Sequence, residues 1–323
     1  MKHYIYIIMC VCLLASCSSG KEKKAAVKGK AQSAPYELLV VANKDWLKTE
    51  AGQKLVEVVE APISGLPQRE GNFRVTYINP EAFKGVFRFY SNILVVAVGM
   101  KYEESKMTLE KDLYARSQVV EGLYAPTDWA FVRLLEVHQK DILKKFNENE
   151  FARERRFLEK NHNGTVLAQV KKQFGVSIKV PEDVDDMKVG KNFLWASASK
   201  QDFRQNVCIY TLTLTEGLSF EDVRDSVMKV NIPGDREDQW METDRRTVMV
   251  DDITRPDLLV VRGLWDMRND AMGGPFVSYV YADTARNRFL VVEGFAFAPD
   301  KKKRPIMRQL EAALQTVKFE GEK

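Results

Sequence analysis

The order of apolar and polar positions predicts alternating strands and helices in the first third of the chain. The apolar run Glu37–Ala42 is typical of a strand buried on both faces, and Phe73–Ile78 and Asn92–Val98 are two further strands. A helix is expected from Asp45 to Val59, ahead of a proline. The pattern of Asp112–Tyr124 is ambiguous, and we interpret it as another strand.

A long charged helix follows. It begins near Thr127 or Asp128, either of which can cap its first turn, and it extends to Asn161. Its charged residues stand mostly at helical spacings, as on a solvated helix face. Asn163-Gly164 is a stop signal, and a second, short helix is expected over Thr165–Phe174.

The last part of the chain is rich in strands. Seven strands are predicted there: Val176–Val180, Phe193–Ala198, Val207–Leu214, Thr247–Val250, Leu258–Leu264, Phe276–Ala282 and Phe289–Ala298. Ser219-Phe220-Glu221-Asp222 resembles a capping box at the start of one helix. The final helix, with Pro305 in its first turn, carries an apolar stripe that would pack on the sheet.

These elements predict an α+β fold of mostly antiparallel sheets packed by helices, with two sub-domains joined by the long helix. The expected boundaries are a signal peptide at 1–16, a lipidated cysteine with a flexible basic tether at 17–34, an N-terminal α/β sub-domain at 35–125, a helical connector at 126–174 and a C-terminal α+β sub-domain at 175–323.

The first residues indicate the cellular location of the protein. Tyr4 to Leu14 is apolar but shorter than the ~20 residues of a membrane-spanning helix, as in a signal peptide. The sequence Leu14-Ala15-Ser16-Cys17 resembles the lipobox of bacterial lipoproteins, which implies that Cys17 becomes an acylated first residue. Ser18 implies the outer rather than the inner membrane by resemblance to bacterial sorting rules, whereas periplasmic or surface facing stays open.

The charge of the chain lies mainly near this anchor. Of 49 basic and 45 acidic residues, six lysines and one glutamate precede Pro35, which leaves 43 basic and 44 acidic residues in the body. A body with a net charge of −1 lacks the electrostatic footprint of a nucleic-acid-binding protein. The tether lysines are suited to an anionic membrane surface or to a solvated linker.

Motifs for chemistry are missing from the sequence. It contains no Walker loop, no Gly-x-Gly-x-x-Gly, no EF-hand loop and no Gly-x-Ser-x-Gly elbow. His138 and His162 stand too far apart along one helix to share a metal ion, and Cys208 sits in an apolar run typical of a buried thiol. We therefore expect neither a cofactor nor a metal, and no residue is assigned a catalytic role.

Two segments are candidate contact surfaces. Gly234–Met241 places Trp240 in a charged connection, and Leu264–Gly274 places Trp265, Asp266 and Arg268 ahead of two glycines. Tryptophan and arginine in loops often anchor interfaces, and tryptophan beside polar side chains suits a sugar. The alternative is that each tryptophan folds back onto its own sheet edge.

Three motifs carry a family resemblance. Pro35–Ala42, Ala61–Gln68 and Arg304–Glu311 together resemble a domain-of-unknown-function family (4837-type) of Bacteroidota lipoproteins. The resemblance implies an envelope lipoprotein and carries no activity. The pattern after Gly175 also resembles the PsbP/Mog1 type of α+β sandwich, at the level of fold alone.

In such a lineage, two further motifs are similar to an O-glycosylation acceptor, Asp followed by Ser or Thr and a small residue. Asp283-Thr284-Ala285 lies at an expected hairpin turn, where a glycan fits, whereas Ser226 lies within a helix. Thr284 is the candidate.

The sequence thus predicts a lipid-anchored envelope protein of unknown activity. We expect a non-enzymatic binding or assembly module whose partners are the membrane, through Cys17, and an envelope protein or glycan. The alternatives are an envelope hydrolase that uses carboxylates on glycans and a lipid-binding carrier.

Overall fold

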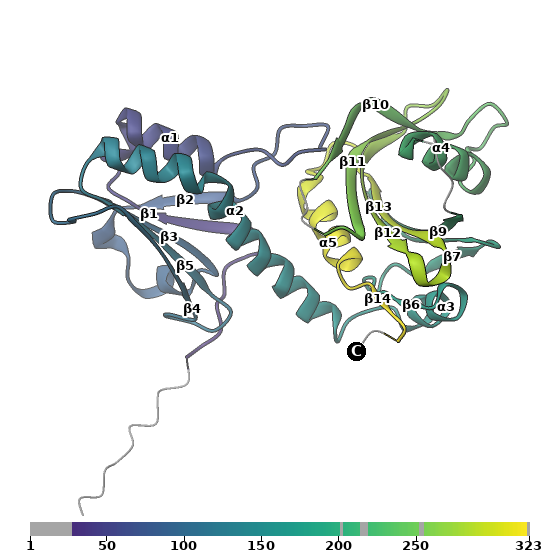
Figure 1. Cartoon of the computed structure of the whole chain (residues 1–323), viewed down its shortest axis with the longest axis horizontal. Coiled ribbons are helices and arrows are strands. Elements are labelled where there is room, and N and C mark those ends of the chain that lie inside the picture. Colours follow the sequence, from purple (N-terminus) through teal and green to yellow (C-terminus); the bar gives the residue numbers. More distant parts are fainter. Residues whose placement is uncertain (1–27, 201–202, 214–218, 252–254, 322–323) are drawn as a thin grey trace, which may run out of the picture.

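The computed structural model describes residues 28–200, 203–213, 219–251 and 255–321. They form an N-terminal and a C-terminal body, which lie on either side of a long helix (Figure 1). Within the described ranges, no helix combines the length and the apolar character needed to cross a bilayer. The predicted signal peptide lies outside them.

The N-terminal body is built on a five-stranded sheet in the order β2-β1-β3-β5-β4. Four strands are parallel, and β4 joins the edge antiparallel to β5. The strands are β1 (Glu37–Val41), β2 (Arg74–Ile78), β3 (Asn92–Val98), β4 (Lys106–Lys111) and β5 (Val119–Ala125). Parallel strands are buried on both faces, which explains the continuous apolar runs in the sequence.

Helices cover one face of this sheet. They are α1 (Glu50–Val59), which follows the single turn η1 (Trp46–Lys48), and α2 (Asp128–Leu158). Leu55 of α1 and Phe131 and Phe146 of α2 pack on this face. The short 3-10 segments η2 (Pro80–Ala82) and η3 (Gly85–Phe89) belong to the opposite side, where Phe83 and Phe87 pack against the sheet.

The C-terminal body is built on a seven-stranded antiparallel sheet in the order β10-β11-β12-β13-β9-β8-β7. Its strands are β7 (Asp186–Val189), β8 (Phe193–Lys200), β9 (Phe203–Thr213), β10 (Met241–Val250), β11 (Leu258–Met267), β12 (Gly273–Asp283) and β13 (Arg288–Phe297). A small second sheet pairs β6 (Val176–Ser177) with β14 (Lys318–Phe319).

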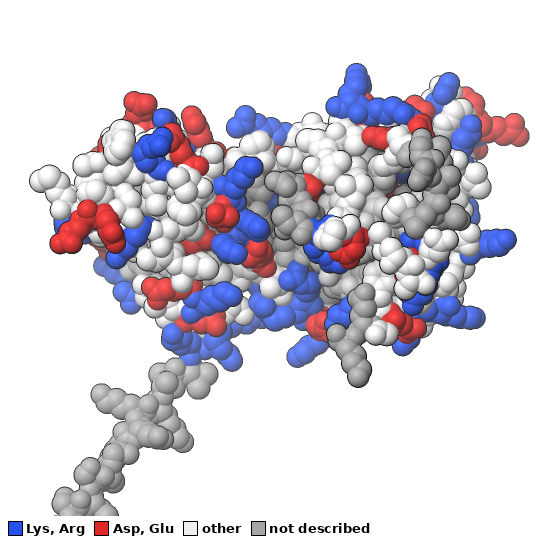
Figure 2. All heavy atoms as spheres, viewed as in Figure 1, with Lys and Arg blue, Asp and Glu red and all other residues white. Residues whose placement is uncertain are grey.

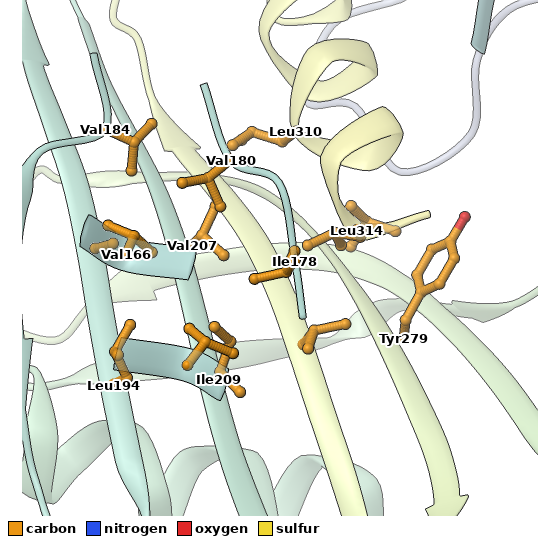
Figure 3. Packing of buried hydrophobic residues seen from close by; sticks show 14 of the residues in the cluster. Val166, Ile178, Val180, Val184, Leu194, Val207, Ile209, Tyr279, Leu310 and Leu314 are labelled. Carbon is orange, nitrogen blue, oxygen red and sulfur yellow. The ribbon is translucent and has the colours of Figure 1, made fainter. Parts of the chain in front are cut away.

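Helices lie on both faces of the large sheet. The first face holds α3 (Gly164–Phe174) and α5 (Arg304–Leu314), and Figure 3 shows Leu310 and Leu314 of α5 above Ile178 and Val207 in the core. The second face holds α4 (Phe220–Asn231), with Met228 in a separate core. The helix–sheet–helix layering confirms the predicted α+β class.

The two bodies contact each other through α5 and the segment between α1 and β2, which reaches across to the C-terminal body (Figure 1). Leu66 of this segment packs on the core beneath α5. The Glu70 carboxylate accepts hydrogen bonds from the backbone at the start of α5, at 2.7 Å from Lys303 N. Arg308 donates to Asn72 Oδ1 at 2.7 Å. Two of the motifs behind the family resemblance therefore meet at this joint.

Several expectations need correction. The strand expected at Asp112–Tyr124 is Val119–Ala125. The exposed edge strands Lys106–Lys111 and Asp186–Val189 were not expected, because their polar composition hides the alternation. The strand expected at Thr247–Val250 begins six residues earlier, at Met241.

Part of the segment expected to be a flexible tether has contacts in the structure. Residues 28–34 lie along the N-terminal body, where Ala31 N donates to Arg116 O at 3.0 Å and Gln32 N donates to Phe89 O at 2.9 Å. Ala31 is buried. The described body thus begins at Lys28 and not at Pro35.

Candidate functional site

A groove of about 980 Å³ opens between α4 and the large sheet. Its floor consists of strand residues from β9, β12 and β13, and one wall is the first half of α4. Mostly apolar side chains line it, among them Leu212, Val227, Val280, Phe289 and Val291. A cavity of this size and apolar character is typical of a small-molecule site.

Alternation along the strands supplies the floor. Successive side chains of a strand point to opposite faces, so Tyr210 and Leu212 of β9 share the α4 face, whereas Ile209 belongs to the opposite core. Helix α4 begins at its predicted cap, where Ser219 Oγ accepts from Asp222 N at 3.1 Å. The capping box thus places the first turn of α4 along the groove.

A buried ion pair holds α4 on the sheet. Arg224 of α4 and Glu293 of β13 are both 0% exposed, and Arg224 Nη2 lies 2.8 Å from Glu293 Oε1. Thr243 accepts from Arg224 at 2.9 Å, and Ser278 donates to Glu293 at 2.7 Å. Burial lowers the pKa of Arg224, but the Glu293 carboxylate outweighs burial and the pKa ends above its usual value. The pair therefore stays charged and carries no net charge.

Tyr210 is the unexplained polar group in the groove. It lines the floor and is 1% exposed, and its hydroxyl has no hydrogen-bond partner among the described residues. Burial, with a further contribution from Glu293, raises the pKa of Tyr210 well above its usual value, so the hydroxyl keeps its proton. Buried polar groups are normally satisfied. The hydroxyl is thus an unsatisfied donor beneath the groove.

The rim of the groove is charged, and its charges are paired. Asp222 accepts from Arg245 at 2.6 Å, and Asp251 accepts from Arg262 at 2.9 Å. Arg255 donates to Asp257 at 3.2 Å. This rim leaves the apolar floor as the principal surface for a ligand.

The two segments predicted to make contacts do meet, at one end of the same sheet. Arg268 N donates to Trp240 O at 2.9 Å, and Gln239 Nε2 donates to Asp270 Oδ2 at 2.9 Å. Asn269 Nδ2 donates to Asp238 Oδ2 at 3.1 Å. Sequence reasoning identified both segments but did not predict that they pair with each other.

Trp265 does not lie in a loop, and this placement corrects the expectation. It belongs to β11, is 1% exposed and packs edge-on against Phe295. It lines a cavity of about 190 Å³, and its Nε1 lacks a hydrogen-bond partner within the described chain. A surface contact through Trp265 is therefore ruled out by burial, and its indole N–H is an unsatisfied donor in the wall of the cavity.

The other predicted contact residues remain at the surface. Trp240 is half-buried, with the Lys229 ammonium 4.0 Å and the Arg268 guanidinium 4.7 Å from its ring centroid. Asp266 and Arg268 are exposed. Trp240 and Arg268 thus form one small cluster with Lys229 of α4.

Three further residues from the sequence analysis, Thr284, Cys208 and Cys17, lie apart from these cavities or outside the described residues. Thr284 is exposed in the turn η4 (Thr284–Arg286) between β12 and β13, as expected of a hairpin tip. Cys208 is fully buried beside Glu293, and burial raises the pKa of its thiol. Cys17 lies outside the described residues. Across the described ranges, no three His, Cys, Asp or Glu side chains cluster to hold a metal ion.

Two family models match the chain. Residues 163–316 match the family model of a domain of unknown function (DUF4837), and residues 31–159 match that of another domain of unknown function (DUF8532). The resemblance to the 4837-type family is thereby confirmed for residues 163–316, which contain the groove. No curated protein matches the sequence.

Two solved structures show a weak likeness. The Saccharomyces cerevisiae Ran-binding protein Mog1p and a mutant of Mog1 each align over 90% of their own length with 45% of this chain, at 11% identity and a TM-score of 0.31. A likeness at this level carries no argument about function. The fold assignment rests on the strand order described above.

Proposed function

We propose that the chain is a lipid-anchored protein of the cell envelope that binds an apolar ligand in the α4 groove, without catalysis. The observation that carries this proposal is the buried Tyr210 hydroxyl, which lines a largely apolar groove of about 980 Å³ and has no hydrogen-bond partner in the described chain. Ligand sites commonly combine apolar walls with one or two polar groups that fix orientation. The groove favours the lipid-binding alternative over contact through loops alone.

The ligand is an apolar molecule with one uncharged oxygen acceptor, of the kind found in an esterified acyl chain. Tyr210 keeps its proton and can donate to a carbonyl oxygen. The neighbouring charges of Arg224 and Glu293 cancel, so the floor offers no counter-charge for an ionised head group. An ester carbonyl meets both conditions.

A neutral probe tests the groove. In residues 18–323, Ser226→Trp places a large ring on the groove side of α4, and we expect it to weaken binding of a fluorescent monoacylglycerol at least tenfold. Val230 is also on α4 but lies outside the groove lining and is 76% exposed, so Val230→Trp is the matched control. Equal binding by both variants would exclude the groove as the site.

The anchor is the second part of the proposal, and it is supported by Leu14-Ala15-Ser16-Cys17. Two or more acyl chains hold a protein stably on a membrane, whereas one chain does so only marginally. The Cys17→Ser chain is therefore expected to move from the membrane fraction to the soluble fraction. Retention of the variant on membranes, in an unprocessed form, would instead indicate a membrane-inserted segment. The predicted outer-membrane location can be read from the same fractions after the two membranes are separated.

A second candidate function concerns the end of the sheet near Trp240. The cavity of about 190 Å³ beneath the paired segments presents the partnerless indole N–H of Trp265, which suits a small acceptor-bearing group of a glycan or partner protein. Quenching of tryptophan fluorescence by an envelope glycan, lost in Trp265→Phe, would support it. Unchanged fluorescence over millimolar glycan would exclude this candidate.

The glycosylation of Thr284 is a separate proposal. It is supported by the exposed position of Thr284 on η4 and by the Asp283-Thr284-Ala285 motif. We expect the intact mass of the native protein to exceed the mass calculated for the lipidated chain. The Thr284→Ala variant should have the calculated mass of its lipidated chain. An unmodified Thr284 peptide from the native protein would dispose of the proposal.

A further inference from the structure

We propose that the face around the C-terminal end of α2 docks on an anionic membrane surface. This face, which we call the α2 cleft, is a hollow of about 790 Å³ lined by the end of α2 and by the segments around Lys30 and Arg116. It lies apart from the α4 groove, and it belongs to the N-terminal body and the connector.

Four cations at the α2 cleft have no carboxylate partner within the described residues. They are Lys30, Arg116, Arg156 and Lys160, and all four are exposed. Two carboxylates of the cleft are paired, since Glu150 binds Arg153 at 2.7 Å and Glu159 binds Lys179, and the third, Glu154, accepts from Gln309. The cleft therefore presents a net positive charge on a body that is nearly neutral overall.

An exposed aromatic side chain lies among these cations. Phe157 is 53% exposed and lines the cleft between Arg156 and Lys160. Membrane-interface surfaces combine basic residues with exposed aromatic or aliphatic side chains, which enter the boundary between head groups and acyl chains. A soluble acidic partner would account for the cations but not for Phe157.

Tyr36 is an unsatisfied polar group in the wall of the cleft. It lines the cleft and is 7% exposed, and no described residue hydrogen-bonds its hydroxyl. Burial raises the pKa of Tyr36, so that the hydroxyl remains a donor. A phosphate oxygen of a lipid head group is an acceptor that complements the surrounding cations.

The position of the cleft fits a membrane surface. The described chain begins at Lys28, two residues before Lys30, and Figure 2 shows lysine and arginine side chains along the edge of the molecule from which this end of the chain departs. A chain held at Cys17 would keep this edge near the bilayer. The inference thus deepens the proposed anchoring, but its charge and shape arguments do not depend on acylation.

Vesicle binding without the anchor tests the inference. Residues 18–323 lack Cys17 and retain every described residue, so they are expected to bind vesicles that contain phosphatidylglycerol and not vesicles of phosphatidylcholine alone. Each cation near such a surface contributes about fivefold in affinity. Arg156→Glu with Lys160→Glu should therefore weaken binding more than tenfold. Phe157→Ser should weaken it at high as well as low salt.

The control changes charge by the same amount elsewhere. Lys101→Glu with Lys106→Glu alters two exposed lysines near the opposite end of β5 from Arg116 and should leave vesicle binding within about twofold. Equal losses of vesicle affinity in the two double variants would overturn the proposed docking face. Equal binding to vesicles with and without phosphatidylglycerol would overturn it as well. Full competition by millimolar inorganic phosphate would overturn it too, since the site would then bind free phosphate. Because the assay omits the anchor and the groove, its failure leaves both of those proposals standing.

Discussion

Arg224 on α4 and Glu293 on β13 form a fully buried ion pair across the layer that separates the helix from the sheet. The two residues are 69 positions apart, and Arg224 also stacks over Phe276 at 4.1 Å. This contact fixes the distance between α4 and the floor of the groove, so the shape of the proposed ligand site depends on it.

Breaking the pair should be costly. Arg224→Met leaves Glu293 buried without its partner, and we expect a loss of about 3–5 kcal/mol in the free energy of unfolding, measured with urea. The double variant Arg224→Met with Glu293→Leu should recover most of this loss, because neither charge is then buried. Arg245→Met, which breaks an exposed pair with Asp222, should cost no more than about 1 kcal/mol. Similar costs for Arg224→Met and Arg245→Met would contradict the assignment.

Glu121 should make stability depend on pH. It is 0% exposed on β5, neither carboxylate oxygen has a partner in the described chain, and burial raises its pKa from 4.5 to about 8. The folded state therefore holds its proton where the unfolded state has lost it. The contribution of Glu121 to the free energy of unfolding is fully present below pH 4.5. It falls as the pH rises to about 8, by up to about 1.4 kcal/mol per pH unit.

Unfolding titrations over this range, compared with Glu121→Gln, measure the effect. The amide cannot ionise, so the difference between wild type and variant should grow in favour of the variant up to about pH 8. Glu110→Gln, at an exposed position of β4, is the control and should run parallel to the wild type. A constant difference between Glu121→Gln and wild type across the range would refute a raised pKa.

At the joint between the two bodies, Glu70 of the segment between α1 and β2 caps the N-terminus of α5. Lys303 precedes α5 and offers no side-chain cap, whereas Glu70 accepts from Lys303 N at 2.7 Å and from Arg304 N at 3.2 Å. Glu70→Ala should therefore cost about 0.5–2 kcal/mol. Amide hydrogen exchange should speed up at the start of α5 in this variant. The exposed Glu57→Ala in α1 should leave both quantities unchanged, and unaltered exchange in Glu70→Ala would argue against the cap.

Sequence patterns predicted the elements whose cause is local. The Ser219 cap, the Pro305 first turn and the stop at Gly175, which has a φ of 69°, are all where the sequence placed them. The burial of Arg308 and Glu311 on the polar side of α5 was not predictable, because it depends on tertiary contacts, of Arg308 with Asn72 of the other body and of Glu311 with Arg262 of β11. The pairing of Arg224 with Glu293 was hidden because the two residues stand 69 positions apart and meet only when α4 docks on the sheet.

The site carried signals that sequence reasoning missed. Trp265 was expected in a loop because Asp266 and Arg268 are charged. Period-two alternation, however, puts Trp265 and Met267 on the buried face of a strand and the two charged residues outside. The same alternation along β9 places Tyr210 on one face with Cys208 and Leu212. A tyrosine within an apolar strand was a visible sign of a polar group in the core, but the groove above it depends on where α4 docks.

The most direct test of the ligand site is the affinity of Tyr210→Phe for two neutral probes, an acylglycerol with an ester carbonyl and an alkane-tailed probe without one. Loss of one hydrogen bond in a water-poor groove should weaken the ester probe about three- to tenfold and leave the alkane probe unchanged. Stability should not fall in the ligand-free protein, because the hydroxyl has no partner there among the described residues. Equal affinities of wild type and Tyr210→Phe for the ester probe would contradict the account.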